Sequence, residues 1–553
     1  MRYILRCYLF LVLIASSSLL SPFSLRAEAQ LAPDLTVMIP MRDGQLLSTD
    51  LYYPEEKGKS YPCVLVRSPA GRKAFPWCRL AQLSSRGYIV AMQDTRSALD
   101  TDGRTLPFIT DGWGVLQDGY DTVEWLAKSP HCNGKVVTAG WSAAGITQLM
   151  LGPAAPPSLV GQHIGMATGS LYHHAIYPGG KLLQNQVELW LGLYARDPGV
   201  QLHVEHQPRY NPFWQQLDSI AVADRVEVPA LFYTGWYDTF LQGTVDAFKA
   251  RQERGKSGAS GKQKLVIGPW GHYGPVDNRL GDFHLPEGAY LPPIDISPLA
   301  WFDSLLQEEG SHSSWPVVSY YVMGPLDATP SAAGHRWAFA EQWPPPCPRK
   351  NWLLSSERKL VAANGERWEA TIDRYRHDPL EPVPTLGGWN LFFESGPKDQ
   401  QPLFERKDLL TYSSEPLDGE LQVTGTPRLS LVSNSSSQEW DLIVRFCDLY
   451  PNGQSIPLSE GVCHLKRPIG TAEDQPLAAN IELLPMSAVF AKGHRLQLII
   501  ASSSYPRYAK GDKSAMLYMG QEKLVPAQIE IHSSPLLPSQ LELPIMEMRA
   551  EAN

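Results

Sequence analysis

Short apolar runs alternate with amphipathic segments along the first third of the chain. Leu35–Tyr53 alternates apolar and polar residues around a turn, which predicts a β-hairpin. Cys63–Val66, Tyr88–Gln93 and Lys135–Ala139 are apolar runs of strand length, whereas Asp118–Lys128 repeats its apolar residues at helical spacing. This alternation predicts a parallel sheet covered by helices.

The pattern changes after residue 151. From Gly152 to Glu227 strand signals vanish, Pro, His, Trp and Tyr cluster, and Leu183–Tyr194 has helical spacing. Apolar strands resume at Pro229–Thr234 and Lys264–Ile267. The stretch between the two strand-rich parts therefore predicts a helical cap inserted into the α/β core.

The character changes again after Gly324, where many short alternating runs are separated by turn residues and few helical stretches occur. This pattern is typical of an all-β sandwich or jelly roll. We therefore expect an α/β-hydrolase core in residues 30–151 and 228–324, a cap in 152–227 and a β domain in 325–553.

The first 29 residues have the features of a secretory signal peptide. Arg2 and Arg6 precede the apolar run Cys7–Ala15, and Ala27-Glu28-Ala29 provides small residues for cleavage. The run is short for a membrane span, although an uncleaved N-terminal anchor remains the alternative. No later stretch is apolar enough to cross a bilayer. The sequence thus predicts a secreted or periplasmic protein.

The composition excludes some classes of function for this protein. The 553 residues carry a net charge of −9, with no basic stripe of the kind that binds nucleic acid. Six cysteines follow the predicted cleavage site. Cys447 and Cys463 flank a predicted hairpin and are our first choice for a disulfide, while six reduced thiols remain the alternative. No Cys/His spacing suggests zinc, and we expect no metal or cofactor.

The strongest chemical signal is Gly140-Trp-Ser-Ala-Ala-Gly145, which follows the strand Lys135–Ala139 and precedes a helix-like segment. A serine on such a tight strand-to-helix turn needs small neighbours. The turn would expose the Ser142 hydroxyl as a nucleophile and leave the Ala143 N–H free to bind an oxyanion. Ala144 occupies the usual place of the second glycine.

A nucleophilic serine needs a base, and the base needs an orienting acid. The strand Pro229–Thr234 leads into Gly235-Trp-Tyr-Asp238, and Lys264–Ile267 leads into Gly268-Pro-Trp-Gly-His272. Active sites of open α/β sheets lie at the carboxyl ends of their strands. We therefore predict a triad of Ser142 as nucleophile, Asp238 as acid and His272 as base.

The segments GWSAAG, GWYDTF and GPWGHYG resemble those of the cocaine esterase and Xaa-Pro dipeptidyl-peptidase-like family of serine hydrolases. Supporting segments are Leu65–Pro69, Gln93–Arg96, Cys132–Gly134, Trp301–Asp303 and Tyr412–Leu417. The resemblance runs over nearly the whole mature chain. It implies acyl transfer to water through a covalent acyl-enzyme, with the triad roles above. Relatives with this β domain often self-associate, so it also implies a homo-oligomer.

One position departs from the family pattern. The family usually reads R-x-P-Y after this strand and uses the tyrosine hydroxyl as second oxyanion donor, but here the position is Ala70. Ser68, Arg72 or a backbone N–H near Gly71 could substitute. Loss of one donor costs on the order of 2.7–4 kcal/mol of transition-state stabilisation.

Several other residues have open interpretations. Trp141 and Trp236 adjoin the predicted site and would form either an aromatic acyl pocket or plain core. Histidines in the cap, His173-His174 and His203-Val-Glu-His206, lack the spacing of a helical metal site and are expected to be solvated or pocket-lining.

Charged side chains also lie close to the predicted strands. Asp94 and Arg96 resemble a structural pair behind the sheet, and Asp118 and Asp121 are expected to line a solvated helix face.

Together these observations predict a hydrolase of small-molecule esters or amides, or of short peptides. A true Xaa-Pro dipeptidyl peptidase is the alternative within enzymes, although no carboxylate for the substrate α-amine can be identified in the cap. A catalytically weak binding protein is the alternative outside enzymes, favoured by Ala70 and opposed by the intact triad order.

Overall fold

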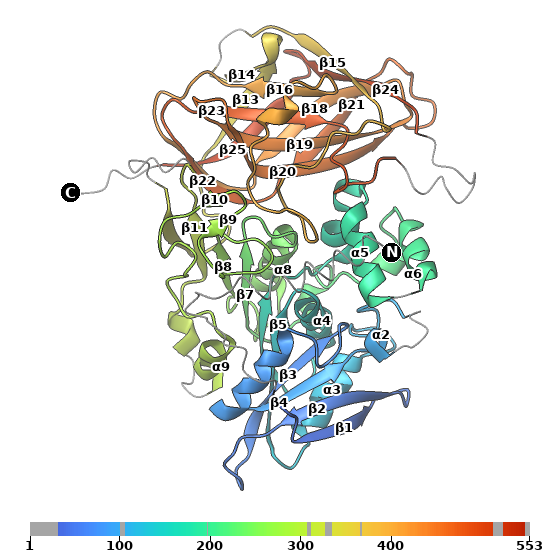
Figure 1. Cartoon of the computed structure of the whole chain (residues 1–553), viewed down its shortest axis with the longest axis vertical. Coiled ribbons are helices and arrows are strands. Elements are labelled where there is room, and N and C mark those ends of the chain that lie inside the picture. Colours follow the sequence, from blue (N-terminus) through green and yellow to red (C-terminus); the bar gives the residue numbers. More distant parts are fainter. Residues whose placement is uncertain are drawn as a thin grey trace, which may run out of the picture.

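A computed structural model describes residues 31–99, 105–195, 197–306, 311–326, 334–364, 368–511 and 524–547. It consists of an α/β core, a β-rich domain formed by the second half of the chain, and cap helices between them (Figure 1). The predicted signal peptide, residues 1–29, lies outside the described residues. The predicted fold class, an α/β-hydrolase core with a C-terminal β domain, is confirmed.

The core is built on a ten-stranded sheet with the order β1-β2-β4-β3-β5-β6-β7-β8-β11-β12. The strands from β4 to β11 run parallel, and antiparallel strands close both edges. The strands are β1 (Leu35–Pro40), β2 (Leu46–Tyr52), β3 (Tyr61–Ser68), β4 (Ile89–Asp94), β5 (Cys132–Trp141), β6 (Leu159–Gly165), β7 (Ala230–Gly235), β8 (Lys264–Gly268), β11 (Val318–Val322) and β12 (Arg336–Ala340).

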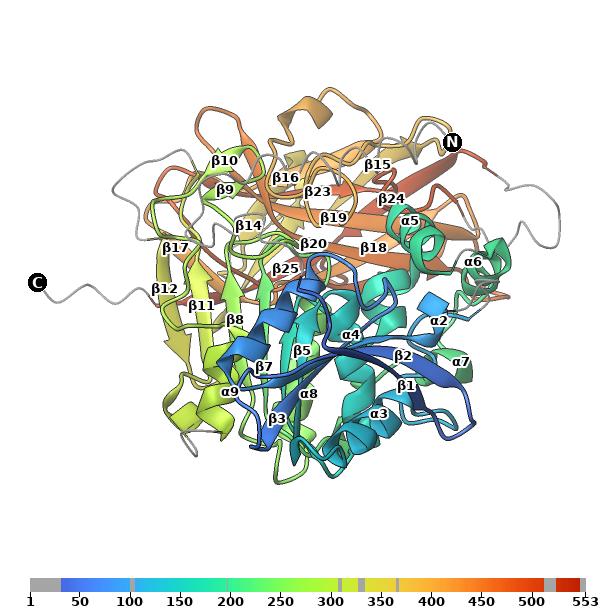
Figure 2. The ribbon, with the colours of Figure 1, turned by 60° about the horizontal axis from the view of Figure 1, so that its bottom comes forward.

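Alternate residues of the central strands face opposite layers, which explains their continuous apolar runs. On β3, Val64 and Val66 pack with η1 and α9, whereas Cys63 and Leu65 pack with α3. Helices α4 and α8 contact the sheet at β5 and β7 respectively, and Figure 2 shows both faces of the sheet. The helices are η1 (Trp77–Arg86), α2 (Arg96–Leu99), α3 (Asp118–Ala127), α4 (Ala143–Leu151), η2 (Gly152–Ala154), α8 (Leu241–Arg254), α9 (Pro298–Leu306) and η6 (Ser311–Ser314).

Two predicted boundaries are wrong. β6 lies inside the stretch expected to be cap and is the central strand between β5 and β7. Its sequence, LVGQHIG, contains polar residues that form hydrogen bonds in the core: Gln162 donates to the Gln148 carbonyl, and His163 bonds the Ile296 carbonyl through Nε2. The sequence of β6 therefore contains no continuous apolar run, although the strand is buried. β12 lies beyond residue 324 and still belongs to the core sheet.

The cap contains short helices between β6 and β7. Its element α5 begins directly after Leu183 and contacts the site loop, because Thr239 donates a hydrogen bond of 2.6 Å to Gln186 on α5. The cap elements are η3 (Tyr172–Ile176), η4 (Pro178–Gly180), α5 (Gln184–Tyr194), α6 (Pro198–Glu205), α7 (Pro212–Gln215) and η5 (Ala223–Arg225).

The β-rich domain follows the core, and almost all its strand pairs are antiparallel. A small two-stranded sheet, β9 (Arg279–Leu280) and β10 (Phe283–His284), lies in the core near its border. The domain contains β13 (Arg349–Ser355), η7 (Ser356–Arg358), β14 (Lys359–Ala362), β15 (Thr371–His377), η8 (Gln401–Leu403), β16 (Leu409–Ser413), β17 (Leu421–Gly425), β18 (Arg428–Ser435), β19 (Glu439–Leu449), β20 (Ser455–Lys466), β21 (Leu477–Glu482), β22 (Met486–Phe490), β23 (Arg495–Ala501), β24 (Ala527–Ser533) and β25 (Gln540–Met546).

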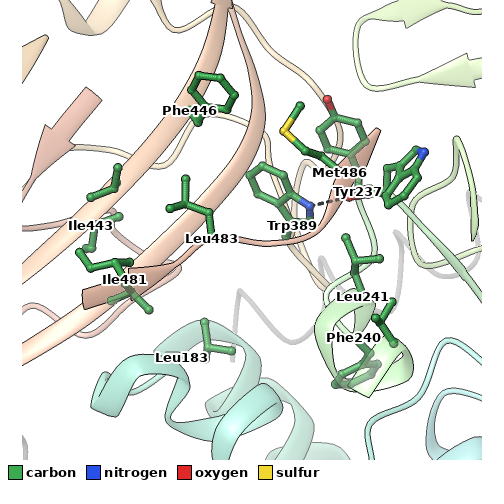
Figure 3. Packing of buried hydrophobic residues seen from close by; sticks show 14 of the residues in the cluster. Leu183, Tyr237, Phe240, Leu241, Trp389, Ile443, Phe446, Ile481, Leu483 and Met486 are labelled. Carbon is green, nitrogen blue, oxygen red and sulfur yellow. Dashed lines mark hydrogen bonds between the residues drawn. The ribbon is translucent and has the colours of Figure 1, made fainter. Parts of the chain in front are cut away.

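Core and β domain share one continuous apolar cluster. Tyr237 of the core stacks on Trp389 of the β domain with ring centroids 5.4 Å apart, and its hydroxyl donates to the Pro457 carbonyl at 2.8 Å. Figure 3 shows the two rings close to Met486, with Leu241 below them. The β domain is therefore packed against the loop that carries Asp238.

An ion pair joins the cap to the β domain. Lys181 donates to Asp441 at 2.5 Å, both side chains are buried, and His464 donates from Nδ1 to the other oxygen of Asp441 at 2.8 Å. Burial alone would raise the pKa of Asp441, but the positive charges and hydrogen bonds of Lys181 and His464 together hold it below its ordinary value. The cap is thus connected to the β domain as well as to the sheet.

The first-choice disulfide is wrong, because the six cysteines of the described residues are all reduced. Across the β19–β20 ladder, Cys463 stands opposite Leu442 and Cys447 stands opposite Pro457. The two thiols are thus out of register by five residues along β19 and six along β20, and a bridge would require the strands to slide.

The predicted pairing of Asp94 with Arg96 is also wrong. Asp94 accepts hydrogen bonds from the backbone and guanidinium of Arg72. Arg96 instead donates to Asp118 at 2.7 Å on both oxygens and also pairs with Asp43. Asp118 is fully buried, so it does not lie on a solvated helix face.

Asp121 forms a bidentate pair with Arg42.

Among the helices of the described residues, none is long and apolar enough to span a membrane.

Candidate active site

The Ser142 turn has the strained geometry of a nucleophile elbow. Ser142 stands between β5 and α4 with φ of 56° and ψ of −127°, a conformation that few non-glycine residues adopt. A Cβ on Gly145 would lie 2.6 Å from the Ala167 Cβ and 2.9 Å from the Gly165 carbonyl oxygen, and one on Gly140 would lie 2.6 Å from the Ala144 Cβ. Because Gly140 and Gly145 have no side chain, the turn packs closely against its neighbours, as the sequence predicted.

The three predicted side chains meet above the carboxyl edge of the sheet. His272 Nε2 lies 2.8 Å from Ser142 Oγ, and His272 Nδ1 lies 2.7 Å from Asp238 Oδ1. A carboxylate can only accept, so Nδ1 carries the proton and Nε2 accepts from the serine hydroxyl. Asp238 is fully buried and His272 is 6% exposed, so the relay is shielded from water except at the serine.

Two further donors hold Asp238. Thr234 Oγ1 donates to Asp238 Oδ2 at 2.9 Å, and the Phe240 backbone N–H donates to Oδ1 at 3.2 Å. The carboxylate thus accepts three hydrogen bonds, which fix its orientation toward the imidazole. Sequence reasoning missed Thr234, although its place at the end of a predicted strand, four residues before the acid, is a local signal.

Sequence reasoning also missed one residue next to the acid and one from a distant segment. Phe240 packs edge-on against the His272 ring, with centroids 5.4 Å apart. Trp389 Nε1 donates to the Trp236 carbonyl at 2.6 Å and so holds the backbone two residues before Asp238 from the β domain. Trp389 and Trp236 are 153 positions apart in the chain, and no local signal in the sequence could have found this contact.

The oxyanion side of the site has one clear donor. The Ala143 N–H opens helix α4, where the first N–H groups have no partner within the helix. Of the predicted substitutes for the tyrosine, Arg72 is engaged by Asp94 and lies 3.0 Å from Asp50, and the Gly71 N–H donates to the Ser68 carbonyl. The buried Ser68 hydroxyl accepts from the N–H of Ala70 at 3.1 Å.

The two tryptophans of the predicted acyl pocket lie in different surroundings. Trp236 is buried, donates from its indole to the Tyr321 carbonyl at 2.7 Å and packs on Trp343, so it belongs to the core. Trp141 is partly exposed and packs on Trp77 of η1 with centroids 6.0 Å apart. Only Trp141 thus remains a candidate for contact with a ligand.

The cap histidines make ordinary side-chain contacts. His174 lies 3.2 Å from Asp246, His173 packs on Tyr210, and His203 packs edge-on against Phe213. In the part of the chain that the structure describes, no group of three or more His, Cys, Asp or Glu side chains could hold a metal ion.

The chain is similar to proteins of known family. The model of the X-Pro dipeptidyl-peptidase S15 family matches residues 43–201 and 188–274, and that of the X-Pro dipeptidyl-peptidase C-terminal non-catalytic domain matches residues 313–542. The cocaine esterase of Rhodococcus sp. (strain MB1 Bresler) is 28% identical over 92% of this chain and 98% of its own. The chain belongs to the cocaine esterase and Xaa-Pro dipeptidyl-peptidase-like family.

Solved structures of other proteins have the same fold as this chain. An aminopeptidase from a marine sediment Thaumarchaeota archaeon superposes with a TM-score of 0.75 at 21% identity, covering 96% of this chain and 100% of its own. An α-amino acid ester hydrolase superposes with a TM-score of 0.74 at 23% identity, covering 95% and 100%. These structures show that the fold is shared over nearly the whole chain. By its family, the chain is a hydrolase of the esterase or peptidase type, with both domains of the family present.

Proposed function

We propose that this protein hydrolyses an ester or amide bond through a covalent acyl-enzyme on Ser142. The observation that carries the proposal is the continuous relay from Ser142 Oγ through the imidazole of His272 to the buried Asp238, with heavy-atom distances of 2.8 and 2.7 Å. These distances lie within the range over which a general base accepts a proton.

In the proposed first step, Ser142 Oγ attacks the substrate carbonyl while His272 Nε2 accepts its proton. Asp238 stabilises the imidazolium that forms, and the Ala143 N–H binds the oxyanion. His272 then donates its proton to the leaving alcohol or amine. A water molecule, deprotonated by the same imidazole, attacks the acyl-enzyme and releases the acid, after which Ser142 regains its proton.

The contacts of the cap favour an esterase or acylase over a dipeptidyl peptidase. A dipeptidyl peptidase needs a carboxylate that binds the substrate α-amine. In the cap, Glu205 accepts from Gln201, and Asp218 accepts from Tyr210. Glu188 on α5 likewise accepts from Gln184. These three carboxylates are thus engaged within the cap, and the similarity to cocaine esterase supports the same choice.

Labelling with a fluorophosphonate tests the mechanism. We expect labelling of the wild-type protein at Ser142, none in Ser142→Ala, and strongly reduced labelling in His272→Ala. Folding of each variant is checked by thermal unfolding. A folded wild-type protein that neither labels nor hydrolyses esters would overturn the proposal and support the alternative of a binding protein without catalytic activity.

A substrate panel tests the choice of bond. We expect p-nitrophenyl and aminoacyl esters to be turned over faster than Xaa-Pro anilides, with β-lactam amides as a further comparison. Faster turnover of the Xaa-Pro anilides would replace the esterase proposal by the peptidase alternative.

We also propose export to the periplasm or medium after cleavage near Ala29, and self-association of the mature chain. The apolar run Cys7–Ala15 and the family membership support these two proposals respectively. N-terminal sequencing of the protein from fractionated cells and light scattering of the mature chain test them.

A further inference from the structure

A small pocket lies where the cap, the β domain and the loop of Asp238 meet. Its walls come from the first turn of α5, from residues 390–393 of the β domain and from Arg507. Gln186 of this wall accepts the hydrogen bond from Thr239, the residue that follows Asp238. The cavity volume is about 10 Å³, which is room for one atom of the size of a water oxygen.

One nitrogen of the Arg507 guanidinium is free. Nε donates to Glu460 at 2.9 Å, and Nη1 donates to the Trp389 carbonyl. Nη2 has no hydrogen-bond partner among the described residues, although Arg507 as a whole is only 7% exposed. Unlike Nη2 of Arg67, which is sealed in the interior without a partner, Nη2 of Arg507 keeps accessible surface. Because Arg507 lines the pocket, Nη2 is the donor that an occupant of the pocket contacts.

The charges around Arg507 do not balance. Glu460 accepts from Nε of both Arg507 and Arg445, at 2.9 and 3.2 Å, and all three side chains are buried. The other two nitrogens of Arg445 donate to Gln400 and Ser504. Among the described residues, no second carboxylate forms an ion pair with either guanidinium. The group therefore carries one buried positive charge without a counter-charge, which an anion would stabilise.

The N-terminal end of α5 adds to the positive potential of the pocket. This helix of 11 residues begins after Leu183, where no side chain caps it (Figure 3). The Asn185 N–H donates to the Pro506 carbonyl at 3.2 Å, whereas the Gln186 N–H has no acceptor among the described residues. Free N–H groups and the helix dipole favour negative charge at this end. Helix and guanidinium thus favour the same kind of ligand.

We infer that this pocket binds one oxygen of a carboxylate, which accepts a hydrogen bond from Arg507 Nη2 at the N-terminus of α5. One oxygen fills the pocket, and the carbon chain of the ligand lies against the apolar side chains of Leu391 and Phe393. The carboxylate comes from one of two sources, a substituent of a substrate held at Ser142 or a free carboxylic acid.

Calorimetric titration with sodium formate, the smallest carboxylate, tests the site. We expect formate to bind the Ser142→Ala variant as well as the wild type, which separates this test from the proposed catalysis. Formamide has the same shape without the charge and should bind at least 10-fold more weakly, because it leaves the positive charge uncompensated. Equal affinity for the two, or no binding of formate up to its solubility, would overturn the inference.

Two variants at one position locate the binding without disturbing the ion pair of Arg507. Asn185→Asp places a carboxylate on the pocket wall and should weaken formate binding at least 10-fold relative to Asn185→Ala. An Asp in the first turn of a helix is favourable, so we expect this variant to fold, and thermal unfolding checks it. Equal affinity of the two variants for formate would contradict the assigned position.

A second pair of variants tests the guanidinium itself. Arg507→Met should lose formate binding, whereas Arg374→Met makes the same change in an exposed ion pair of the β domain and should keep it. Thermal unfolding shows whether each variant is folded. Formate binding by a folded Arg507→Met protein at wild-type affinity would refute the role of Arg507.

Esters with and without a charged end distinguish the two sources, and this arm rests on the proposed function. The p-nitrophenyl monoesters of straight-chain diacids are each compared with the neutral ester of the same acyl length. A KM ratio, charged over neutral, that is about 10-fold higher in Asn185→Asp than in Asn185→Ala identifies a substrate carboxylate. Equal ratios in the two variants identify a free carboxylic acid as the ligand. A protein that binds formate but hydrolyses none of these esters would refute the proposed function and leave the carboxylate site in place.

Discussion

Replacement of Ala70 by tyrosine is the sharpest test of the oxyanion side of the site. Strands β3 and β5 are parallel neighbours, so Ala70, two residues beyond β3, lies at the same edge of the sheet as Ser142, one residue beyond β5. Neighbouring strands are about 4.8 Å apart, a gap that a tyrosine side chain can cross. Ala70 is exposed, so the larger ring has room.

The expected gain follows from the number of donors. A second donor to the oxyanion contributes on the order of 2.7–4 kcal/mol, which corresponds to about 10²- to 10³-fold in kcat. We therefore expect Ala70→Tyr to raise kcat for a p-nitrophenyl ester by up to this factor, with a small change in KM. Ala70→Phe is the matched control, because it adds the ring without the hydroxyl.

Initial rates over a range of substrate concentrations separate kcat from KM for the two variants. If Ala70→Tyr is no faster than Ala70→Phe, the reasoning is refuted, because the hydroxyl then contributes nothing. Ser68→Ala in the wild-type background shows whether the Ser68 hydroxyl already provides the second donor, in which case kcat falls in that variant.

Three further changes test how the relay is held. Thr234→Val removes a donor to Asp238 and should lower kcat about 10-fold at unchanged KM, while Thr234→Ser keeps the activity; an equal loss in both contradicts the hydrogen-bond role. Trp389→Phe keeps the stacked ring but loses the indole donor, and should lower kcat several-fold with little loss of thermal stability; unchanged kcat would show that the β domain does not position the acid. Burial lowers the pKa of His464, but the hydrogen bond to Asp441 and the negative charges of Asp441 and Glu439 together outweigh it and raise the pKa above its ordinary value of about 6.5. The His464–Asp441 pair therefore stabilises the fold fully below about pH 6.5, and this stabilisation is lost as pH rises through the folded-state pKa. His464→Gln should thus lower Tm more at pH 5.5 than at pH 8.5. An equal loss of Tm at both pH values would contradict a stabilising charged pair.

The amino-acid sequence was sufficient for the features that depend on neighbouring residues. The elbow at Ser142 needs small residues at fixed offsets, and Asp238 and His272 each follow an apolar strand within a few positions. Strand period, strand ends and tight turns are local properties, so the order of strands and loops indicated where the three side chains would meet.

Other features were decided only by contacts between distant segments. β6 is buried with polar residues because the carbonyls of Gln148 and Ile296 form hydrogen bonds with them, and neither contact can be inferred from the strand itself. Likewise the register of β19 and β20 separates the two cysteines that the sequence suggested as a pair.

The support of the acid by the β domain is also decided by contacts between distant segments. Trp389 reaches the Asp238 loop from a separate domain. A single sequence records the chemistry of each side chain and its local conformation. Which distant side chains come into contact is set by how sheet, cap and β domain pack to bury their apolar faces, and this only the tertiary structure determines.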